Sequence, residues 1–322
     1  MRRFNLILLA ITLLIAIPIY WLLLDNRPGD IPPKPISIDQ LRALAEQLPG
    51  AKPNDVEGEV AGYRSVPRDL FAAGAGLKRE PIAVLAWRLR AADGSSVVID
   101  SGITTKDAAA MGIEKLNPPG QARIERALRE ANLILFTHEH PDHQAAALRL
   151  AGGIPAAAKF NPGQLPPAAL AARLPWPSGT LPQASLRSDA PFAVAPGVVV
   201  IPAPNSHTPG SQMIYVKTAD GQELLFAGDI ATLAFSWQDL RARSRLVSQF
   251  LAKENRDEVY AWLKTIRKWK AQAAGLKIFP GHDVGSLLPD KGHPPLARSP
   301  LTFPAPAKSA VRPMLQDQGN LE

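Results

Sequence analysis

The most continuous hydrophobic feature of the chain lies near its N-terminus. No charged side chain occurs between Phe4 and Leu24, whereas Arg2 and Arg3 precede this apolar run and charged residues follow it. At a rise of about 1.5 Å per residue, a helix of this length crosses the roughly 30 Å hydrocarbon core of a bilayer. The run therefore predicts a transmembrane anchor over residues 1–24.

The flanks of this run favour an uncleaved anchor over a signal peptide. The apolar stretch continues through residues 19–24, and no small-x-small cleavage site follows it. Tyr20 and Trp21 lie at its far end, where interfacial aromatic side chains are expected. The arginine pair before the run predicts a cytoplasmic N-terminus and an extracytoplasmic remainder, which is periplasmic if the source is a Gram-negative bacterium. A cleaved signal peptide and a buried helix of a soluble protein are the alternatives.

A linker and a short helix are predicted between the anchor and the rest of the chain, over residues 25–56. Residues 25–36 are rich in proline and indicate a semi-rigid spacer. Ser37-Ile38-Asp39-Gln40 has the pattern of a capping box that opens a helix, and Pro49-Gly50 ends it.

From residue 57 onwards the apolar positions indicate strands that alternate with helices. Asp93-Gly94 and Asp220-Gly221 are hairpin turn signals between apolar runs. Strands in hairpins followed by helices, twice over, predict an α+β fold with two sheets sandwiched between helices over residues 57–290. The predicted strands are 82–91, 96–99, 133–136, 198–201, 213–218, 223–226 and 277–279, and the predicted helices are 121–131, 142–150 and 255–273. Short helices and loops are predicted for 151–196, and a Pro-rich, disordered tail for 291–322.

The composition restricts the chemistry that is open to the chain. Its 322 residues are 46% hydrophobic, which is enough for a substantial core. None of them is cysteine. Disulfides, thiolate metal sites and cysteine nucleophiles are therefore excluded. Any metal must be held by histidine and carboxylate side chains, a ligand set that suits zinc and similar divalent ions.

The net charge of +7 is concentrated in one segment. Residues 241–270 carry nine basic and three acidic side chains, a net charge of +6. One interpretation is a binding surface for an anionic partner. The favoured interpretation is the solvated face of a helix, with Trp262, Leu263, Ile266 and Trp269 on its other side. The arginines at 241, 243 and 245 either line a pocket or face solvent.

Histidines cluster in one short segment. The chain has six, and three of them fall in Thr137-His138-Glu139-His140-Pro141-Asp142-His143. His138 and His140 are two residues apart in an extended segment, so their side chains point to the same side. Asp142 and His143 begin the following helix. Four potential ligands after one buried strand can serve two metal ions side by side.

Three further candidates each follow a predicted strand. His207 lies in Asn205-Ser206-His207-Thr208-Pro209-Gly210, Asp229 in Ala227-Gly228-Asp229, and His282 in Pro280-Gly281-His282. Glycine or proline adjoins each of them, as expected where the backbone turns tightly beside a site.

The order and spacing of these motifs resemble the metallo-β-lactamase superfamily over residues 57–290. The resemblance implies a four-layer αββα sandwich with two metal ions at one edge, between the sheets. It also implies a role for each motif residue. The first ion is bound by His138, His140 and His207, the second by Asp142, His143 and His282, Asp229 bridges the two ions, and Asp100 in Asp100-Ser101-Gly102 supports the site from behind its ligands.

This ligand set predicts a di-zinc hydrolase, with iron and manganese as alternatives. Two ions lower the pKa of a shared water towards ~7, and the resulting hydroxide attacks a carbonyl or phosphoryl centre. We expect Asp142 to be catalytic, orienting the hydroxide and carrying its proton to the leaving group. An Asp142→Ala variant that keeps both metals and full activity would contradict this role.

The bridging aspartate and the absence of cysteine are similar to the glyoxalase II and lactonase branch of the superfamily. His207-Thr208-Pro209-Gly210 adds to this similarity, but Ser211 stands where glyoxalase II has histidine, and its glutathione-binding residues find no match. Hydrolysis of an ester, lactone or thioester in a small-molecule substrate is therefore predicted. The alternatives are a phosphodiesterase or nuclease that uses the basic segment, and a metal-loaded binding protein without activity. The extracytoplasmic location argues against a nucleic-acid partner, and the oligomeric state has no signal in the sequence.

Overall fold

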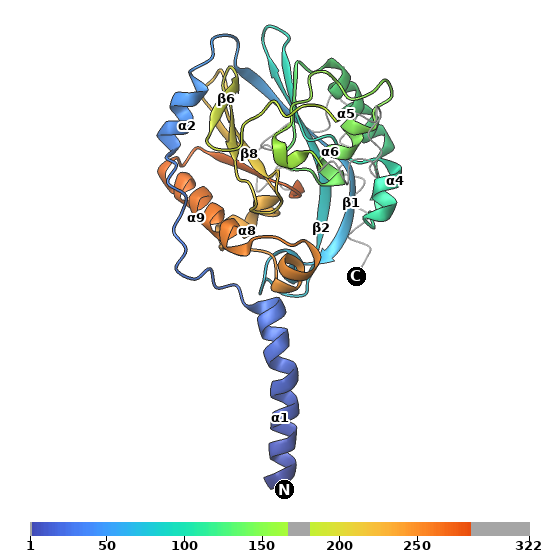
Figure 1. Cartoon of the computed structure of the whole chain (residues 1–322), viewed down its shortest axis with the longest axis vertical. Coiled ribbons are helices and arrows are strands. Elements are labelled where there is room, and N and C mark those ends of the chain that lie inside the picture. Colours follow the sequence, from blue (N-terminus) through green and yellow to red (C-terminus); the bar gives the residue numbers. More distant parts are fainter. Residues whose placement is uncertain (1, 167–180, 285–322) are drawn as a thin grey trace, which may run out of the picture.

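The computed structural model describes residues 2–166 and 181–284. The predicted Pro-rich tail and part of the 151–196 stretch lie outside these residues. Helix α1 (Arg2–Ile19) continues into a π-helical turn, η1 (Tyr20–Leu24), and projects from the globular part as a single rod (Figure 1). None of its residues is buried. With a mean hydropathy of 2.7, the segment Arg2–Leu24 is long and apolar enough to cross a membrane.

Two five-stranded sheets form the centre of the globular part, within the described residues. The strand orders are β4-β1-β2-β3-β5 and β10-β9-β8-β7-β6. Most neighbours are antiparallel, but β5 and β10 each pair in parallel at an edge. The first sheet comprises β1 (Pro53–Pro67), β2 (Arg79–Ala91), β3 (Ser96–Ile99), β4 (Lys115–Leu116) and β5 (Leu133–Leu135). The second comprises β6 (Phe192–Ala195), β7 (Val198–Pro202), β8 (Gln212–Lys217), β9 (Glu223–Gly228) and β10 (Lys277–Pro280).

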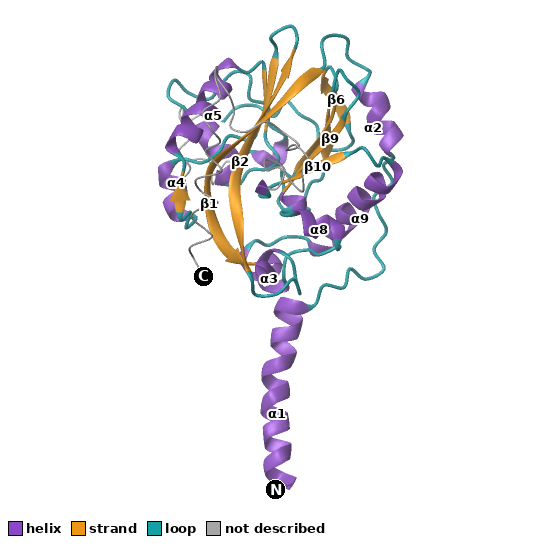
Figure 2. Cartoon of the chain, turned by 180° about the vertical axis from the view of Figure 1, so that it is seen from behind, coloured by secondary structure: helices purple, strands orange, loops and turns teal. Residues whose placement is uncertain are grey.

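Helices cover the outer face of each sheet, which confirms the predicted αββα architecture (Figures 1 and 2). The first sheet is covered by α4 (Thr105–Ala110), α5 (Pro118–Glu130) and α6 (Pro141–Leu148). The second is covered by α2 (Ile38–Ala45) and α9 (Arg256–Gln272), with α8 (Ala234–Gln238) beside them. The short elements α3 (Arg68–Phe71), η2 (Pro162–Gln164), η3 (Asp229–Ala231) and η4 (Leu246–Leu251) lie in connecting loops.

Alternating side chains place the core on both faces of each sheet. In β7, Val199 and Ile201 face the helical layer of α2 and α9, whereas Val198 and Val200 face the other sheet. A strand buried on both faces reads as a continuous apolar run, which is why these strands stood out in the sequence. Between the sheets, Trp87 meets Phe279 edge to face with ring centroids 4.9 Å apart.

The N-terminal linker is packed against the domain. Ser37 caps α2 by accepting a hydrogen bond from the backbone N–H of Gln40, as the sequence pattern predicts. The Pro-rich spacer before it lies along α9, where Thr265 Oγ1 accepts from the Lys34 N–H at 2.7 Å and Trp269 Nε1 donates to the Ile36 carbonyl at 2.9 Å. Helix α1 is therefore joined to the domain by a segment that is bonded to α9.

The interpretation of the basic segment as one solvated helix face is wrong for its first half. Helix α9 begins only at Arg256, after the Asn255 cap, so residues 241–255 are not part of it. Arg243 and Arg256 are both buried. Only the second half fits the prediction, because Arg267 and Lys268 are exposed opposite a buried apolar stripe.

One long strand, β1, does not stand out as an apolar run in the sequence. Strand β1 carries two fully buried glutamates, Glu57 and Glu59, which interrupt its apolar pattern. They are paired in the structure, Glu57 with Arg88 at 2.6 Å and Glu59 with Arg123 at 2.7 Å. Their burial depends on partners that are distant in the sequence, which no local pattern reveals.

Candidate metal centre

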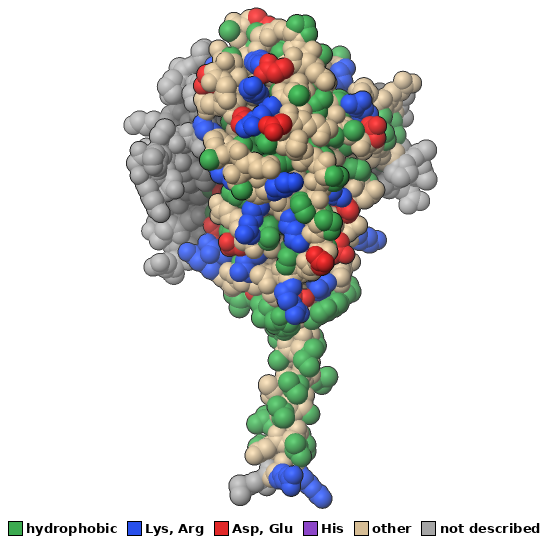
Figure 3. Space-filling view, turned by 90° about the vertical axis from the view of Figure 1, so that its left-hand side faces the viewer, with side chains coloured by type: hydrophobic (Ala, Val, Ile, Leu, Met, Phe, Trp, Pro, Cys, Tyr) green, Lys and Arg blue, Asp and Glu red, His purple; other side chains and the backbone are tan. Residues whose placement is uncertain are grey.

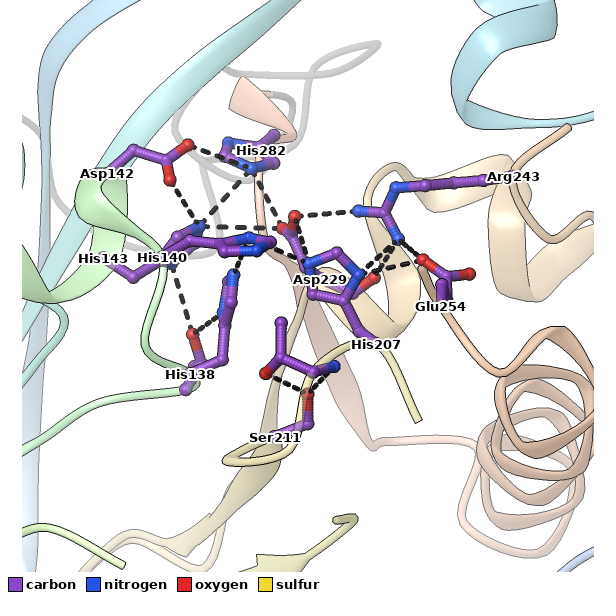
Figure 4. A network of polar contacts seen from close by, with 12 residues as sticks. His138, His140, Asp142, His143, His207, Ser211, Asp229, Arg243, Glu254 and His282 are labelled. Carbon is purple, nitrogen blue, oxygen red and sulfur yellow. Dashed lines mark hydrogen bonds and ion pairs between the residues drawn. The ribbon is translucent and has the colours of Figure 1, made fainter. Parts of the chain in front are cut away.

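All seven predicted metal ligands converge at one edge of the sandwich (Figure 4). Each comes from the end of a strand or from the loop or turn that follows it. His138 and His140 lie in the loop after β5, with Asp142 and His143 in the first turn of α6. His207 lies in the loop after β7, Asp229 directly after β9, and His282 after β10.

The first group consists of His138, His140, His207 and Asp229. The His140 Nδ1 atom lies 2.9 Å from His138 Nε2 and 3.1 Å from His207 Nε2. Asp229 Oδ2 lies 3.4 Å from His207 Nε2. Ligand atoms on a common tetrahedral zinc ion lie about 3.3 Å apart, so these separations fit one divalent ion.

The second group consists of Asp142, His143 and His282. The two Nε2 atoms of the histidines face each other at 3.4 Å. Asp142 Oδ1 lies 3.9 Å from His143 Nε2, and Asp142 Oδ2 lies 3.7 Å from His282 Nε2. The other oxygen of Asp229, Oδ1, lies 2.9 Å from His282 Nε2. Asp229 therefore presents one carboxylate oxygen to each group.

Asp142 Oδ1 is buried without a hydrogen-bond partner among the described residues, and buried Asp229 Oδ1 has only the His282 Nε2 atom, at 2.9 Å, beside it. An unsatisfied buried carboxylate oxygen is unfavourable unless a cation or water satisfies it. Imidazole nitrogens that face one another at hydrogen-bond distance likewise need a proton or a cation between them. Metal ions at the two groups would satisfy all of these atoms, so the donor set fits divalent ions.

Three of the histidines contact a partner through the ring nitrogen that points away from the site. This contact orients the other ring nitrogen towards the site. The Nδ1 atoms of His143, His207 and His282 lie 2.9 Å from Asp100 Oδ2, 2.9 Å from Glu254 Oε2 and 2.7 Å from the Ala83 carbonyl. Metal-binding histidines typically have such partners, which fix the tautomer and the ring orientation.

Asp100 has the position behind the ligands that the family resemblance implies. Its carboxylate accepts from the Thr137 backbone N–H at 2.7 Å and from Thr137 Oγ1 at 2.9 Å, besides contacting His143. Its backbone φ is +61°, a left-handed conformation that aspartate tolerates better than most residues. One side chain thus ties the end of β3 to the start of the ligand loop.

A buried arginine that the sequence analysis did not assign supports the bridging carboxylate. Arg243 donates from Nη2 to Asp229 Oδ2 and from Nη1 to the Asp229 carbonyl, both at 2.8 Å. Its Nη1 atom also donates to Glu254 Oε2 at 2.7 Å. Arg243 and Glu254 therefore hold Asp229 and His207 in one network (Figure 4). From the sequence, Arg243 could line a pocket or face solvent. The structure places it inside the site.

Most pKa shifts in the site favour the protonation states that bind a cation, namely neutral imidazoles and an ionised carboxylate. Burial lowers the pKa of His138 well below its ordinary value and that of His140 to about 4, so both imidazoles are neutral. Burial alone would raise the pKa of Asp229, but His282 and Arg243 outweigh it and hold that pKa well below the ordinary value. His143 is the exception: burial opposes its charge, but Asp100 and Asp142 raise its pKa to about 10.

Two glycines allow the ligand loops to approach closely. Gly228 has φ +51° and ψ −150°, a backbone region essentially restricted to glycine, and a Cβ there would lie 2.6 Å from Thr137 Cβ. A Cβ on Gly281 would lie 2.4 Å from Asp229 Oδ1. The glycines noted beside Asp229 and His282 in the sequence are therefore required by space.

A second polar network, built around Glu139, joins the loop that carries His138 and His140 to the loop that carries His207. Glu139, which lies between the two ligand histidines of the motif, accepts from Thr208 Oγ1 at 2.7 Å and from the Gly210 N–H at 3.1 Å. Ser211, which stands where glyoxalase II has histidine, is bonded within the same loop, because its hydroxyl accepts from the Thr208 N–H at 2.9 Å.

Comparison with known families gives the class of the protein. The family model of the metallo-beta-lactamase superfamily matches residues 79–282. The chain belongs to this superfamily, as its motifs predict, and is a hydrolase of that fold whose His/Asp groups imply divalent metal ions. No curated protein matches the chain by sequence.

Solved structures share the fold at low sequence identity. A quorum-quenching N-acyl homoserine lactone lactonase superimposes with a TM-score of 0.53 at 17% identity, covering 72% of this chain and 93% of its own. An N-acyl homoserine lactone hydrolase with N-hexanoyl-L-homoserine at its catalytic metal centre gives 0.54 at 16%, covering 72% and 94%. A probable metal-dependent hydrolase from Staphylococcus aureus gives 0.55 at 12%, covering 74% and 92%.

Proposed function

We propose that the protein holds two divalent ions, zinc foremost, and hydrolyses an ester, lactone or thioester of a small molecule. The observation that supports this most directly is the position of Asp229, whose two oxygens face separate ligand groups. His138, His140 and His207 would hold one ion, and Asp142, His143 and His282 the other. When bound, such a pair supplies a water of lowered pKa and polarises the substrate oxygen.

The chain itself provides a group for proton handling at this site. Asp142 Oδ1 is buried and has no hydrogen bond among the described residues, while Oδ2 is the atom nearer to His282. One oxygen of Asp142 would bind the ion beside His143 and His282, and the other would accept a hydrogen bond from the attacking water, orient it and hold its proton. Arg243 and Glu254 keep Asp229 and His207 in place during this step.

Several cations of the basic segment are engaged within the fold, which weakens the case for the phosphodiesterase alternative. Arg243 is engaged by Asp229 and Glu254, and Arg256 donates to the Arg243 carbonyl at 3.1 Å. Lys264 and Lys270 donate to backbone carbonyls beside α9. These cations are used within the fold and do not form a phosphate-binding surface. The lactone hydrolases among the structural neighbours favour a carbonyl substrate as the first class to test.

The test compares two substrate classes on the full chain in detergent micelles, loaded with zinc. We expect turnover of an aryl ester or lactone and none of bis(p-nitrophenyl) phosphate. A His138→Ala variant should lose the activity, and Arg267→Ala, at an exposed position of α9, should keep it. Turnover of the phosphodiester alone would overturn the proposed substrate class, and activity that survives His138→Ala would place it outside this site.

We further propose that α1 crosses a membrane with its N-terminus in the cytoplasm and the hydrolase domain outside. The paired arginines Arg2 and Arg3 precede the span, and Tyr20 and Trp21 end it, as anchors of this orientation require. The helix has no buried residue, which distinguishes it from a core helix of a soluble domain.

A further inference from the structure

The most exposed large apolar side chains of the globular part gather at the base of α1. Outside α1 and η1, the described residues expose Leu77 by 74%, Leu251 by 71% and Phe250 by 61%, while other large apolar side chains reach at most 38%. Figure 3 shows hydrophobic side chains gathered where the helix leaves the globular part. We call Leu77, Phe250 and Leu251, together with Tyr20, Trp21 and Leu24 of η1, the anchor-proximal face.

Hydrogen bonds and a cation–π contact hold the segments of this face together. The Gly74 N–H donates to the Leu23 carbonyl at 3.2 Å, which fixes the loop that bears Leu77 against η1. Arg245, the residue that precedes η4, bonds Asp25 at 2.8 Å and lies 5.3 Å from the Trp21 ring. The Ser244 N–H also donates to the Leu70 carbonyl. The exposed side chains are therefore carried by segments bonded to the anchor and to each other.

The charged residues beside the face are suited to an anionic surface. Arg27 follows the span, Lys78 follows Leu77, and Lys253 follows Leu251 by two residues; all three are exposed. The nearby acidic side chains Asp25 and Glu254 are buried and paired with arginines. An apolar patch rimmed by exposed cations is typical of proteins that lie on a membrane interface with anionic lipids.

We propose that the anchor-proximal face is a membrane-contact surface, with Leu77, Phe250 and Leu251 inserted among the lipid headgroups and upper acyl chains. The argument for a bilayer as the occupant is continuity: the face surrounds the point at which a span of membrane length ends. The hydrolase domain then rests on the bilayer and does not swing freely on a tether. This inference rests on the proposed membrane location of α1 and is independent of the proposed substrate.

The absence of cysteine in the chain allows a direct test with single labels. The full chain is prepared as Leu77→Cys, Phe250→Cys and Leu251→Cys, labelled with the fluorophore NBD and reconstituted in phosphatidylcholine–phosphatidylglycerol vesicles. Part of the lipid carries a nitroxide quencher high on the acyl chain. Ile15→Cys in α1 is the positive control. Ala92→Cys, exposed in the β2–β3 hairpin at the end remote from α1, is the negative control (Figure 1).

We expect nitroxide lipids to remove at least about half as much emission from labels on the face as from the Ile15 label, and to leave the Ala92 label unchanged. Quenching at Ile15 without quenching at positions 77, 250 and 251 would overturn the contact surface and leave the anchor intact. No quenching at Ile15 would overturn both. Blue-shifted but unquenched labels on the face would show that protein covers it, which also contradicts the proposal. None of these readouts depends on turnover.

Discussion

At the scale of single residues, the site is defined as much by the partners of its ligands as by the ligands themselves. Asp100, Glu254 and the Ala83 carbonyl each bond the outer nitrogen of one histidine. Arg243 adds a fixed positive charge against the Asp229 carboxylate. Such partners restrict ring rotation and set which nitrogen faces the ion, so their removal lowers the affinity for the metal.

Replacing Asp100 by asparagine tests this support. The Asp100→Asn variant keeps the size of the side chain but loses the charge that holds His143, and we expect zinc affinity to fall about 10–100-fold. Competition with a chromogenic chelator measures the change. Asp93→Asn, at an exposed hairpin position, is the matched control and should bind zinc as the parent chain does. Equal affinities in both variants would show that Asp100 has only a structural role.

Arg243→Gln tests the second support. The substitution leaves Glu254 buried without its cation, and losing one partner of a buried ion pair destabilises a fold by about 3–5 kcal/mol. It also frees Asp229 Oδ2, so zinc content should fall together with the unfolding midpoint. Denaturant unfolding and metal analysis give the two readouts, with Arg267→Gln on the exposed face of α9 as the control. A variant that keeps full zinc content would contradict the role of Arg243 in holding Asp229.

The raised pKa of His143 predicts how pH acts on the metal-free protein. Because the pKa in the fold is about 10, above the ordinary value of about 6.5, protonated His143 stabilises the metal-free fold. That stabilisation is full below pH about 6.5 and is lost as pH rises towards about 10. Zinc requires unprotonated His143, so its stabilising effect should grow over the same range. Unfolding midpoints of chelated and zinc-loaded protein across this range measure both trends; a constant gap between them would contradict the assignment.

At the scale of elements, strand ends and their glycines assemble the site. Strands β5, β7, β9 and β10 each end at the same edge, and each is followed by a ligand. Most core strands were predicted within a few residues because they are apolar runs bounded by turns, whereas β1 was missed because buried glutamates interrupt its apolar pattern. Strand β6, helix α4 and the short α3 and α8 were missed, since they are short and their stability comes from contacts across the fold.

Gly281→Ala tests how closely these elements must approach. The added methyl group would lie 2.4 Å from Asp229 Oδ1 and 2.8 Å from the Gly228 backbone, so the loop after β10 must shift. We expect zinc binding and ester turnover to be lost. Gly275→Ala is the control, because a Cβ there meets nothing within 4 Å and its backbone is not left-handed. Full zinc content in Gly281→Ala would show that the loop yields without moving Asp229.

At the scale of the whole molecule, helix α1 and the hydrolase domain form one connected structure. Asp25 follows the span and accepts from Arg245, while Arg256 links the Asp25 and Arg243 carbonyls. The end of the anchor is thus bonded to the segment that supports the metal centre. The orientation proposed for α1 places this entire assembly outside the cytoplasm.

Labelling of intact cells tests that orientation. A single cysteine at Ala92→Cys should react with a membrane-impermeant maleimide from outside, because the proposed orientation places the hairpin outside the cytoplasm. Reversing the charge with Arg2→Glu and Arg3→Glu should lower the labelled fraction, since the basic pair retains the N-terminus inside. Labelling after lysis gives the total. Protection of Ala92→Cys in intact cells, with full labelling after lysis, would place the domain in the cytoplasm.

The sequence by itself determined the apolar span, the main strands and the family. Each of these is a local signal: a run without charge, a strand bounded by turns, or three histidines within six residues. The sequence also indicated the separate ligands His207, Asp229 and His282, because each follows a predicted strand and has a glycine close by.

Only the tertiary structure decided which distant groups meet. Arg243 and Arg256 belong to a segment whose charge indicates a solvated surface, yet the fold buries both beside the metal centre and the base of the anchor. Glu254 and the paired Glu57 and Glu59 are buried for the same reason. A charge enters the interior only with a partner in place, and that partner is brought by the fold from elsewhere in the chain, so its burial is not written in any local pattern.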